Sequence, residues 1–473
     1  MKALHEMTLT QASKALVSGA VNAVELTQAY LAHIEAAQPH LNAYITINTD
    51  AALNDAQRAD AQRRDGLPCG PLNGIPMAFK DVIDTDGMPT TCHSKLRSDH
   101  ISTSDAFAVA KLKQSGVVTL GKLATHEFAF GGPSHDLPFP PARNPWATAH
   151  IPGGSSSGSG AAVAAGMCSA ALGTDTSGSI RMPAGDCGVV GLKPTFGRVS
   201  LRGVYPLSPS MDHVGPMTST VSDAAMVLEE IAGYDAKDPR SVNFPVPRYL
   251  DHLSGDLRGM KIGVLRDWYE TRARADVAKA LGNAMDVLRD LGALLVEVKA
   301  PPLDELNACG RIILLSEGFA VHGKNLRDRP EDFGKFTRMR MQLGAFVTAE
   351  DYQRAQIARR RLSIEMTSLF ADCEVVLTAN QFRPAARFEE ADDLFPFLKH
   401  PFPTMPFDVT GHPAIAVPCG FSSEGMPIGL QLAARHFDET TLLCAAHAFE
   451  TALGLTQCRP AFPFPEHPRA RPL

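Results

Sequence analysis

The sequence has no run of about 20 consecutive apolar residues, the length that a membrane-spanning helix needs. Its first residues also lack the charged-then-apolar pattern of a secretory signal. Basic residues are not in excess, because 45 Lys and Arg stand against 51 Asp and Glu, for a formal net charge of −6. A broad nucleic-acid-binding surface usually needs a basic excess. We therefore expect a cytoplasmic protein whose partners include neither membrane nor nucleic acid.

Several common catalytic and metal-binding motifs are missing as well. The nine cysteines are scattered and never form a C-x-x-C pair, which argues against zinc ribbons and disulfide frameworks. The chain has no G-x-x-x-x-G-K-[ST] loop for nucleotide phosphates, no H-E-x-x-H zinc motif and no Ser-x-x-Lys nucleophile motif. We predict reduced thiols, and neither a metal nor a cofactor.

The 473 residues, of which 44% are hydrophobic, suffice for a large buried core. Residues 1–64 show helical patterns and are predicted to form an outer helical layer. Helix-to-strand and strand-to-helix units follow, as is typical of α/β architecture. The units expected are a helix over 106–115 before a strand at 116–122, and a parallel crossover built from 261–265, 275–291 and 293–298. Short buried strands are expected at 375–378, 414–418 and 428–432, and a closing helix at 438–453.

The segment 152–194 is the most unusual part of the chain. It carries two clusters of glycine and serine, 153–160 and 174–179, around an apolar run at 161–172. Glycine permits positive φ and close approach of the backbone, and serine hydroxyls can act as nucleophiles or proton relays. A flexible linker would not hold an apolar run between such clusters. We therefore predict that this segment builds an active site.

The second cluster follows a predicted strand end at 170–172 and leads into a short helix that begins near Ile180. Backbone N–H groups at such a turn can converge on developing negative charge. Ser179 could be a nucleophile there, or simply cap the helix. A rival nucleophile exists, since residues 154–158 match G-x-S-x-G. That motif should follow a buried strand, and residues 149–152 do not resemble one. The downstream histidines His412 and His436 could still serve as its base, so this alternative nucleophile remains.

Lys80 stands at the end of a predicted strand over 74–82. Its side chain shares one strand face with Ala78 and Val82. Two interpretations fit this pattern. The ammonium group could extend to water, or the lysine could be buried with a lowered pKa and act as a base.

Together these residues resemble the amidase signature family. The resemblance rests first on the two Gly/Ser clusters and on the spacing of Ser155 and Ser179. It covers nearly the whole chain, through further matching motifs at 74–81, 143–146, 191–195, 212–216, 413–418 and 425–431.

The resemblance implies a Ser–cis-Ser–Lys triad. Ser179 would be the nucleophile, Ser155 the bridging serine after a cis Gly154–Ser155 bond, and Lys80 the base. The backbone of the turn before and at the nucleophile would form the oxyanion hole, from Thr176, Ser177, Gly178 and Ser179. Ser177 departs from the family, in which many members have glycine at this position.

The family fold is also implied. It is an α/β single domain with a central mixed twisted β-sheet covered by helices on both faces. The expected catalytic core spans about 65–235 and 375–460, after the helical layer 1–64. A variable region at about 239–374, together with the loop 131–152, is expected to line the substrate pocket. The predicted substrate contacts are Gly131, Gly132 and Ser156.

The implied activity is that of a serine amidohydrolase acting with water on a small amide-type substrate. A carbamate, a urea-type compound or an ester is an alternative substrate. The chain could also form a homodimer. A second alternative is an amidotransferase A-type subunit. The residues 401–403 are Pro-Phe-Pro where that subunit carries a glutamine-recognising acid, which favours a stand-alone amidase. A catalytically inactive binding protein is disfavoured, because Lys80, Ser155 and Ser179 are all present.

Overall fold

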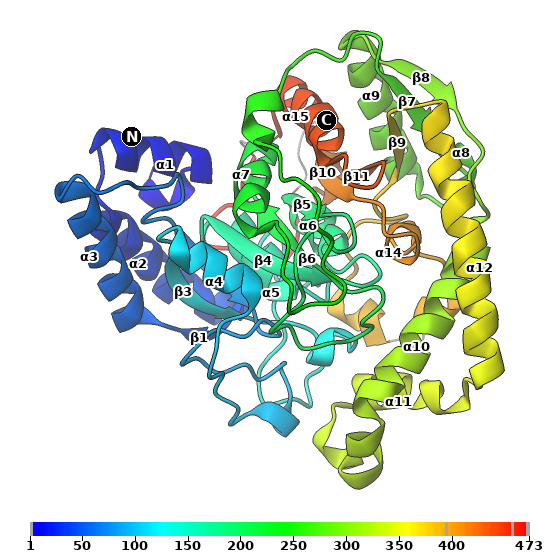
Figure 1. Cartoon of the computed structure of the whole chain (residues 1–473), viewed down its shortest axis with the longest axis horizontal. Helices are drawn as coiled ribbons and strands as arrows, with labels where there is room; N and C mark the ends of the chain where they lie inside the picture. The colour runs from blue at the N-terminus through cyan, green and yellow to red at the C-terminus, as the bar shows by residue number, and fades with distance from the viewer. Residues whose placement is uncertain (1–2, 393–395, 456–457, 470–473) are drawn as a thin grey trace.

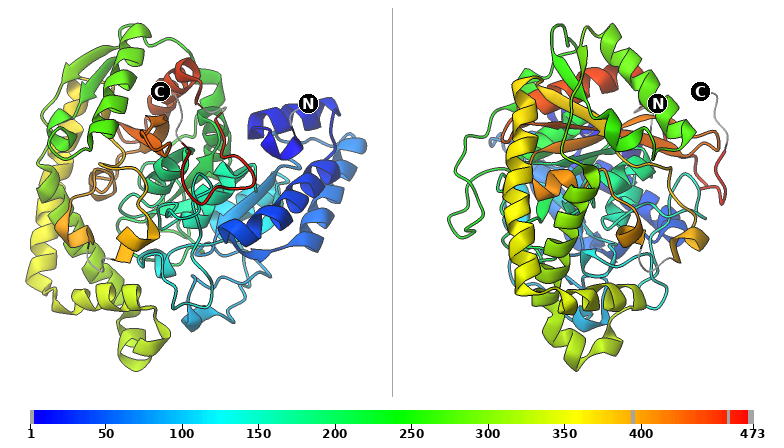
Figure 2. Two further views of the ribbon diagram at one scale, coloured as in Figure 1. Left: turned by 180° about the vertical axis from the view of Figure 1, so that it is seen from behind. Right: turned by 90° about the vertical axis from the view of Figure 1, so that its right-hand side faces the viewer.

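The computed structural model describes residues 3–392, 396–455 and 458–469. Within these ranges one mixed sheet of 11 strands runs through the molecule in the order β1-β3-β2-β4-β6-β5-β10-β11-β9-β7-β8. Helices flank it, with α1–α3 at one end of the molecule and α10–α12 at the other (Figures 1 and 2). The predicted α/β class and mixed central sheet are confirmed.

The strands are β1 (Tyr44–Ile47), β2 (Pro76–Lys80), β3 (Val118–Leu123), β4 (Ala170–Asp175), β5 (Val190–Lys193), β6 (His213–Thr218), β7 (Lys261–Val264), β8 (Leu294–Glu297), β9 (Val375–Ala379), β10 (Ala414–Phe421) and β11 (Pro427–Ala434). The helices are α1 (Leu9–Ser18), α2 (Ala23–Leu41), α3 (Thr49–Arg64), α4 (Phe107–Gln114), α5 (Ser157–Ala164), α6 (Arg181–Cys187), α7 (Val221–Ile231), α8 (Arg266–Tyr269), α9 (Ala275–Asp290), α10 (Leu303–Asp328), α11 (Lys335–Gln342), α12 (Ala349–Ser368), α13 (Pro396–Lys399), α14 (Pro406–Val409) and α15 (Glu439–Leu453).

The sheet contains both parallel and antiparallel pairs. Strand β2 is parallel to both β3 and β4, whereas β4 pairs antiparallel with β6. The expected parallel crossover is present, since β7 and β8 pair in parallel around α9. No helix in the described ranges is long and apolar enough to cross a membrane.

The middle of the sheet is covered on both faces. Every residue of β2 and β4 is buried, so these strands have no solvent face. Lys80 therefore cannot extend to water, and its exposed fraction is 0%. Of the two interpretations of this lysine, the solvated one is wrong, because helices cover the face that the strand pattern alone left open.

One local prediction differs from the structure. The N-terminal segment is not purely helical, since β1 pairs antiparallel with β3 at the sheet edge. The apolar run 161–172 contributes its first residues to α5 and its last residues to β4, which confirms the predicted strand end at 170–172. Helix α5 begins within the first Gly/Ser cluster, where every side chain is small and buried. Close packing, rather than helix propensity, stabilises it there.

Gly121 in β3 marks the closest approach of two strands at this edge. Its φ is +155°, and a Cβ would lie 2.1 Å from the backbone oxygen of Thr46. We expect Gly121→Ala to lower the free energy of unfolding by about 2–4 kcal/mol, because either the backbone pairing or β3 must shift. Gly282→Ala in α9 is the matched control: a Cβ there meets nothing within 4 Å, so a gain of up to about 1 kcal/mol is expected. Equal unfolding midpoints for both variants in thermal denaturation would contradict this account.

Candidate active site

Both Gly/Ser clusters open onto one cavity of about 200 Å³. Ser155 from the first cluster and Ser177 and Ser179 from the second line it. The predicted pocket residues Gly131 and Gly132 line it too, which agrees with the expectation for the loop 131–152. Residues of α10 and α11 line the cavity as well, in agreement with the expectation for the region 239–374.

Lys80 ends β2 directly behind this cavity. Its Nζ donates to Ser155 Oγ at 2.7 Å and to Thr174 Oγ1 at 2.7 Å. Burial lowers the pKa of Lys80 to about 7, although the negative charges of Asp175 and Asp212 act in the opposite direction. A substantial fraction of this lysine is thus neutral near pH 7 and able to accept a proton from Ser155.

The first cluster presents Ser155 to the lysine through an unusual backbone. The Gly154–Ser155 peptide bond is cis, as the family resemblance implied. The backbone N–H of His126 donates to Ser155 O at 3.0 Å. A Cβ on Gly154 would lie 2.1 Å from the His126 ring, so only glycine fits beside this histidine.

Ser156 links the two clusters instead of facing substrate. Its N–H donates to Ser179 O at 3.2 Å, and its Oγ donates to Thr174 O at 3.1 Å and accepts from Thr174 N at 3.2 Å. The side chain is fully buried. The predicted substrate contact of Ser156 is not supported by this geometry, because its hydroxyl is already committed to the backbone of β4.

Contacts from Thr404 and Asp175 fix the turn that carries Ser179. Gly178 has a φ of +124°, and a Cβ there would lie 2.2 Å from Thr404 Oγ1. The same hydroxyl donates to Ser177 O at 2.7 Å. Ser177 itself is not in the left-handed region, so serine fits where many family members have glycine. The Gly178 N–H, expected in the oxyanion hole, donates to Asp175 Oδ1 at 2.5 Å instead.

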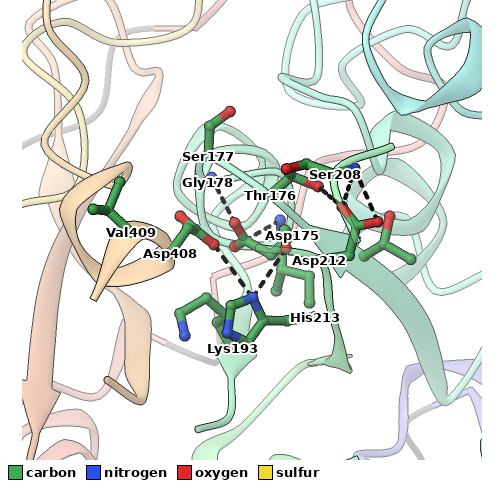
Figure 3. A network of polar contacts seen from close by, with 12 residues as sticks. Asp175, Thr176, Ser177, Gly178, Lys193, Ser208, Asp212, His213, Asp408 and Val409 are labelled. Atoms are coloured by element: carbon green, nitrogen blue, oxygen red, sulfur yellow. Dashed lines mark hydrogen bonds and ion pairs between the residues drawn. The ribbon is translucent and has the colours of Figure 1, made fainter. Parts of the chain in front are cut away.

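A buried network of polar contacts lies beside this turn. In Figure 3 the His213 ring contacts both Asp408 and Asp175. Arg181 donates through Nε to Asp175 Oδ2 at 2.9 Å and through Nη2 to Asp408 Oδ2 at 2.6 Å. Arg181 holds the pKa of Asp175 well below its usual range despite burial, whereas burial and the nearby Asp175 raise that of Asp408. Asp175 is therefore the ionised partner of Arg181. On the other side, Thr176 Oγ1 donates to Asp212 Oδ1 at 2.7 Å.

Sequence reasoning missed Thr404 and Asp408 entirely. Both lie more than 200 positions from the turn that they support, in and just before the short helix α14. No local motif marks them, and only the packing of α14 against α10 and the turn reveals their contacts.

The Amidase family model matches residues 25–443. The chain belongs to this family. The resemblance seen in the two Gly/Ser clusters is confirmed, and the mixed α/β sheet is consistent with the amidase signature fold.

Individual amidase-family relatives match over almost the full length. The A-type subunit of glutamyl-tRNA(Gln) amidotransferase from Roseiflexus sp. (strain RS-1) is 40% identical, covering 95% of this chain and 97% of the relative. The peptide amidase of Stenotrophomonas maltophilia has a solved structure with a TM-score of 0.85 and 32% identity, over 97% of this chain and 99% of that one. A chain from a vestigial complex linked to the origins of an s-triazine catabolic enzyme gives a TM-score of 0.88 and 33% identity, over 96% and 100%.

These relatives bear on the choice between a stand-alone amidase and a member of a larger complex. The curated relatives at about 40% identity are A-type subunits of the amidotransferase, so they do not support the preference for a stand-alone enzyme. The solved structures include both kinds of protein. The family relationship therefore establishes an amidase or amidotransferase enzyme and leaves its assembly to experiment.

Proposed function

We propose that this member of the amidase family cleaves the C–N bond of an amide through an acyl-enzyme on Ser179. The observation that carries the proposal is the 2.7 Å hydrogen bond from Lys80 Nζ to Ser155 Oγ beside the cavity that Ser179 lines. A serine hydroxyl needs a base to become an effective nucleophile, and a lysine whose pKa is near 7 can be that base.

The proton path runs from Ser179 through Ser155 to Lys80. A hydroxyl can donate and accept at once, so Ser155 passes the Ser179 proton to neutral Lys80 as Ser179 Oγ attacks the amide carbon. The same proton returns through Ser155 to the departing nitrogen when the C–N bond breaks. Water then enters, gives its proton along the same path, and releases the acid from Ser179.

The negative charge on the former carbonyl oxygen needs backbone donors. Since the N–H of Gly178 points to Asp175, we assign this role to the N–H groups of Thr176, Ser177 and Ser179. Each well-placed donor of this kind contributes about 3–4 kcal/mol to the transition state. The Thr404 and Asp175 contacts hold the turn rigid, so its donors need no reorganisation during the reaction.

A second candidate is the same chemistry performed as an amidotransferase A-type subunit. The relatives that are 40% and 41% identical over 95% of this chain support it. The position of Phe402 at the cavity, in the neighbourhood where that subunit carries a glutamine-recognising acid, supports a stand-alone amidase instead. Purification of the tagged chain from its own cells separates the two: stoichiometric partner subunits favour the amidotransferase, and an active single species favours the amidase.

The shared chemistry has a direct test. The purified chain is incubated with a panel of amides, anilides, ureas and carbamates plus hydroxylamine, and the quenched enzyme is analysed by mass spectrometry. We expect hydroxamate formation together with an acyl adduct on the peptide that contains Ser179. Turnover with an adduct on another residue, such as Ser155, would overturn the assignment.

A further inference from the structure

A buried carboxyl group lines the proposed catalytic cavity and has no part in the proton path from Ser179 to Lys80. Asp186 shares the lining with Ser155 and Ser179, and it is only 4% exposed. It lies on α6, the short helix that begins two residues after Ser179. Removing a carboxyl group from water is costly unless hydrogen-bond donors or a positive charge face it. Asp186 therefore offers an acceptor to a molecule that enters the cavity.

Helix α6 places Asp186 on its cavity face. Residues four positions apart lie on the same face of a helix. Met182 stands four positions before Asp186 and lines the same cavity. An apolar side chain is thus accommodated one turn away on this wall, so packing alone does not require an acid here. The backbone at this position is fixed, because Asn144 Nδ2 donates to Asp186 O at 2.9 Å.

The Asp186 carboxyl lies close to the backbone that presents Ser155. Gly153, two residues before Ser155, has a φ of +73°, and a Cβ there would lie 2.6 Å from Asp186 Oδ2. In the proposed mechanism Ser155 returns a proton to the departing nitrogen, so this nitrogen has to come within hydrogen-bond distance of Ser155 Oγ. Asp186 is therefore on the amine side of the bond that is cleaved.

The groups around Asp186 leave its carboxyl able to accept further hydrogen bonds. Burial raises the pKa of Asp186 to about 7, whereas the Gln381 side chain, as a hydrogen-bond donor, and the charge of Arg383 act to lower it. Gln381 is itself tied to α6, since its Nε2 donates to Met182 O at 3.1 Å. An ionised carboxyl group has about four acceptor sites, so one amide donor does not occupy all of them.

The other charged side chains of the lining come from separate parts of the chain. They are Arg311 on α10, Arg340 on α11, Arg383 in the segment after β9, and Glu390 a few residues further on. Burial lowers the pKa of Arg311, and the charge of Asp304 acts in the opposite direction. Glu390 is exposed and accepts from the backbone N–H of Arg387 at 3.4 Å. Asp186 is thus the buried carboxyl group of this lining.

We infer that Asp186 is a specificity-determining residue that accepts a hydrogen bond from the N–H of the bond to be cleaved, and so selects amides with this N–H over esters and over amides without it. The nitrogen lone pair has to face Ser155 to receive the proton, and an acceptor for the N–H holds the nitrogen in that orientation. An ester oxygen has no hydrogen to donate, so the buried carboxylate loses this partner. The inference rests on the proposed amide cleavage at Ser179 and names the substrate feature that the site recognises.

Substrates that differ by one group test the inference. N-methylbutyramide and methyl butyrate carry N–H and oxygen at the same position, and both acylate Ser179 with the same butyryl group. Their kcat/KM values, measured as butyrate release above pH 7, thus differ only through steps in which the N–H is still present. We expect Asp186→Leu to lower kcat/KM for the amide by roughly 10- to 100-fold, the range for a hydrogen bond to a charged group, and not to lower it for the ester. N,N-dimethylbutyramide keeps the C–N bond without the N–H and should respond as the ester does.

A conservative variant and a control separate recognition from a structural role. Asp186→Asn keeps the shape and one uncharged acceptor, so its loss for N-methylbutyramide should be smaller than that of Asp186→Leu. Glu390→Gln removes the exposed carboxylate of the same lining and should leave the ratio of amide to ester turnover unchanged. Ester turnover reports in each variant that the active site is folded. Equal losses for amide and ester in both Asp186 variants, or a changed ratio in Glu390→Gln alone, would overturn the inference.

Binding distinguishes failure of this inference from failure of the proposed function. Saturation-transfer NMR on Ser179→Ala compares the affinities of N-methylbutyramide and methyl butyrate without turnover. Tighter binding of the amide that is lost in the Ser179→Ala/Asp186→Leu double variant supports the inference even if the wild-type chain forms no acyl adduct, an outcome that would count against the function alone. An adduct on Ser179 from both substrates, with affinities and rates that Asp186→Leu leaves unchanged, would retain the function and reject the inference.

Discussion

Ser179→Ala is expected to lower kcat for any amide substrate by roughly 10⁶-fold, the loss seen when a serine nucleophile is removed from a comparable triad. The expectation follows from the site geometry, in which Ser179 faces the cavity on a turn that Thr404 and Asp175 hold in place. Alanine removes the only atom that forms the acyl bond and leaves the turn unchanged. The readout is single-turnover hydrolysis together with mass detection of the acyl adduct.

The neighbouring serine provides a control for this variant. Ser177 lines the same cavity on the same turn, but our mechanism uses only its backbone N–H. Ser177→Ala should therefore stay within about tenfold of the wild-type rate, since one neutral side-chain contact contributes little. If the Ser179→Ala and Ser177→Ala variants lost similar activity, or if Ser179→Ala kept the wild-type turnover, the role of Ser179 would have to be abandoned.

Lys80→Ala is expected to lower kcat/KM by roughly 10⁴-fold, within the range for a residue that supports a nucleophile. In the wild-type enzyme the base must be neutral, and burial lowers its pKa to about 7. Lowering the pH below 7 protonates the lysine, so kcat/KM should fall about tenfold per pH unit on the acid side. This acid limb should be absent from the residual rate of Lys80→Ala.

A second variant tests which group causes the fall in kcat/KM at acid pH. Thr174 Oγ1 accepts a hydrogen bond from Lys80 Nζ at 2.7 Å and so stabilises the charged ammonium form. Thr174→Val should lower the pKa of Lys80 further and move the acid limb to lower pH, without removing the base. An acid limb that stays in place in Thr174→Val, or that survives in Lys80→Ala, would show that another group controls the profile.

The local sequence identified the proposed catalytic residues, but it did not predict what surrounds them in the fold. The Gly/Ser spacing and the flanking motifs singled out Ser155, Ser179 and Lys80 before any contact was known. The pattern of β2 could not decide whether Lys80 meets water, because strand alternation says which face a residue occupies and nothing about what covers that face. The structure decides this, with Lys80 fully buried and bonded to Ser155.

Contacts between residues far apart in the sequence could not be predicted for a similar reason. Thr404 and Asp408 support the turn at 176–179 only because the chain folds α14 against it. The three cavity arginines come from α10, α11 and the segment after β9, and in the sequence they are ordinary charged residues. The prediction for Ser156 failed in another way. Its place in a Gly/Ser cluster suggested that it contacts substrate, whereas its hydroxyl is bonded to the backbone of Thr174.

The order of the amino acids was enough to predict the family, the α/β class and the three residues of the proposed triad, because these depend on short motifs in which residue type and spacing carry the chemistry. Only the tertiary structure decided that Lys80 is fully buried, that the N–H of Gly178 donates to Asp175, and that three arginines line the cavity. These properties depend on burial, charge and distance between segments far apart in the chain, and those quantities exist only once the sheet and its helices have packed together.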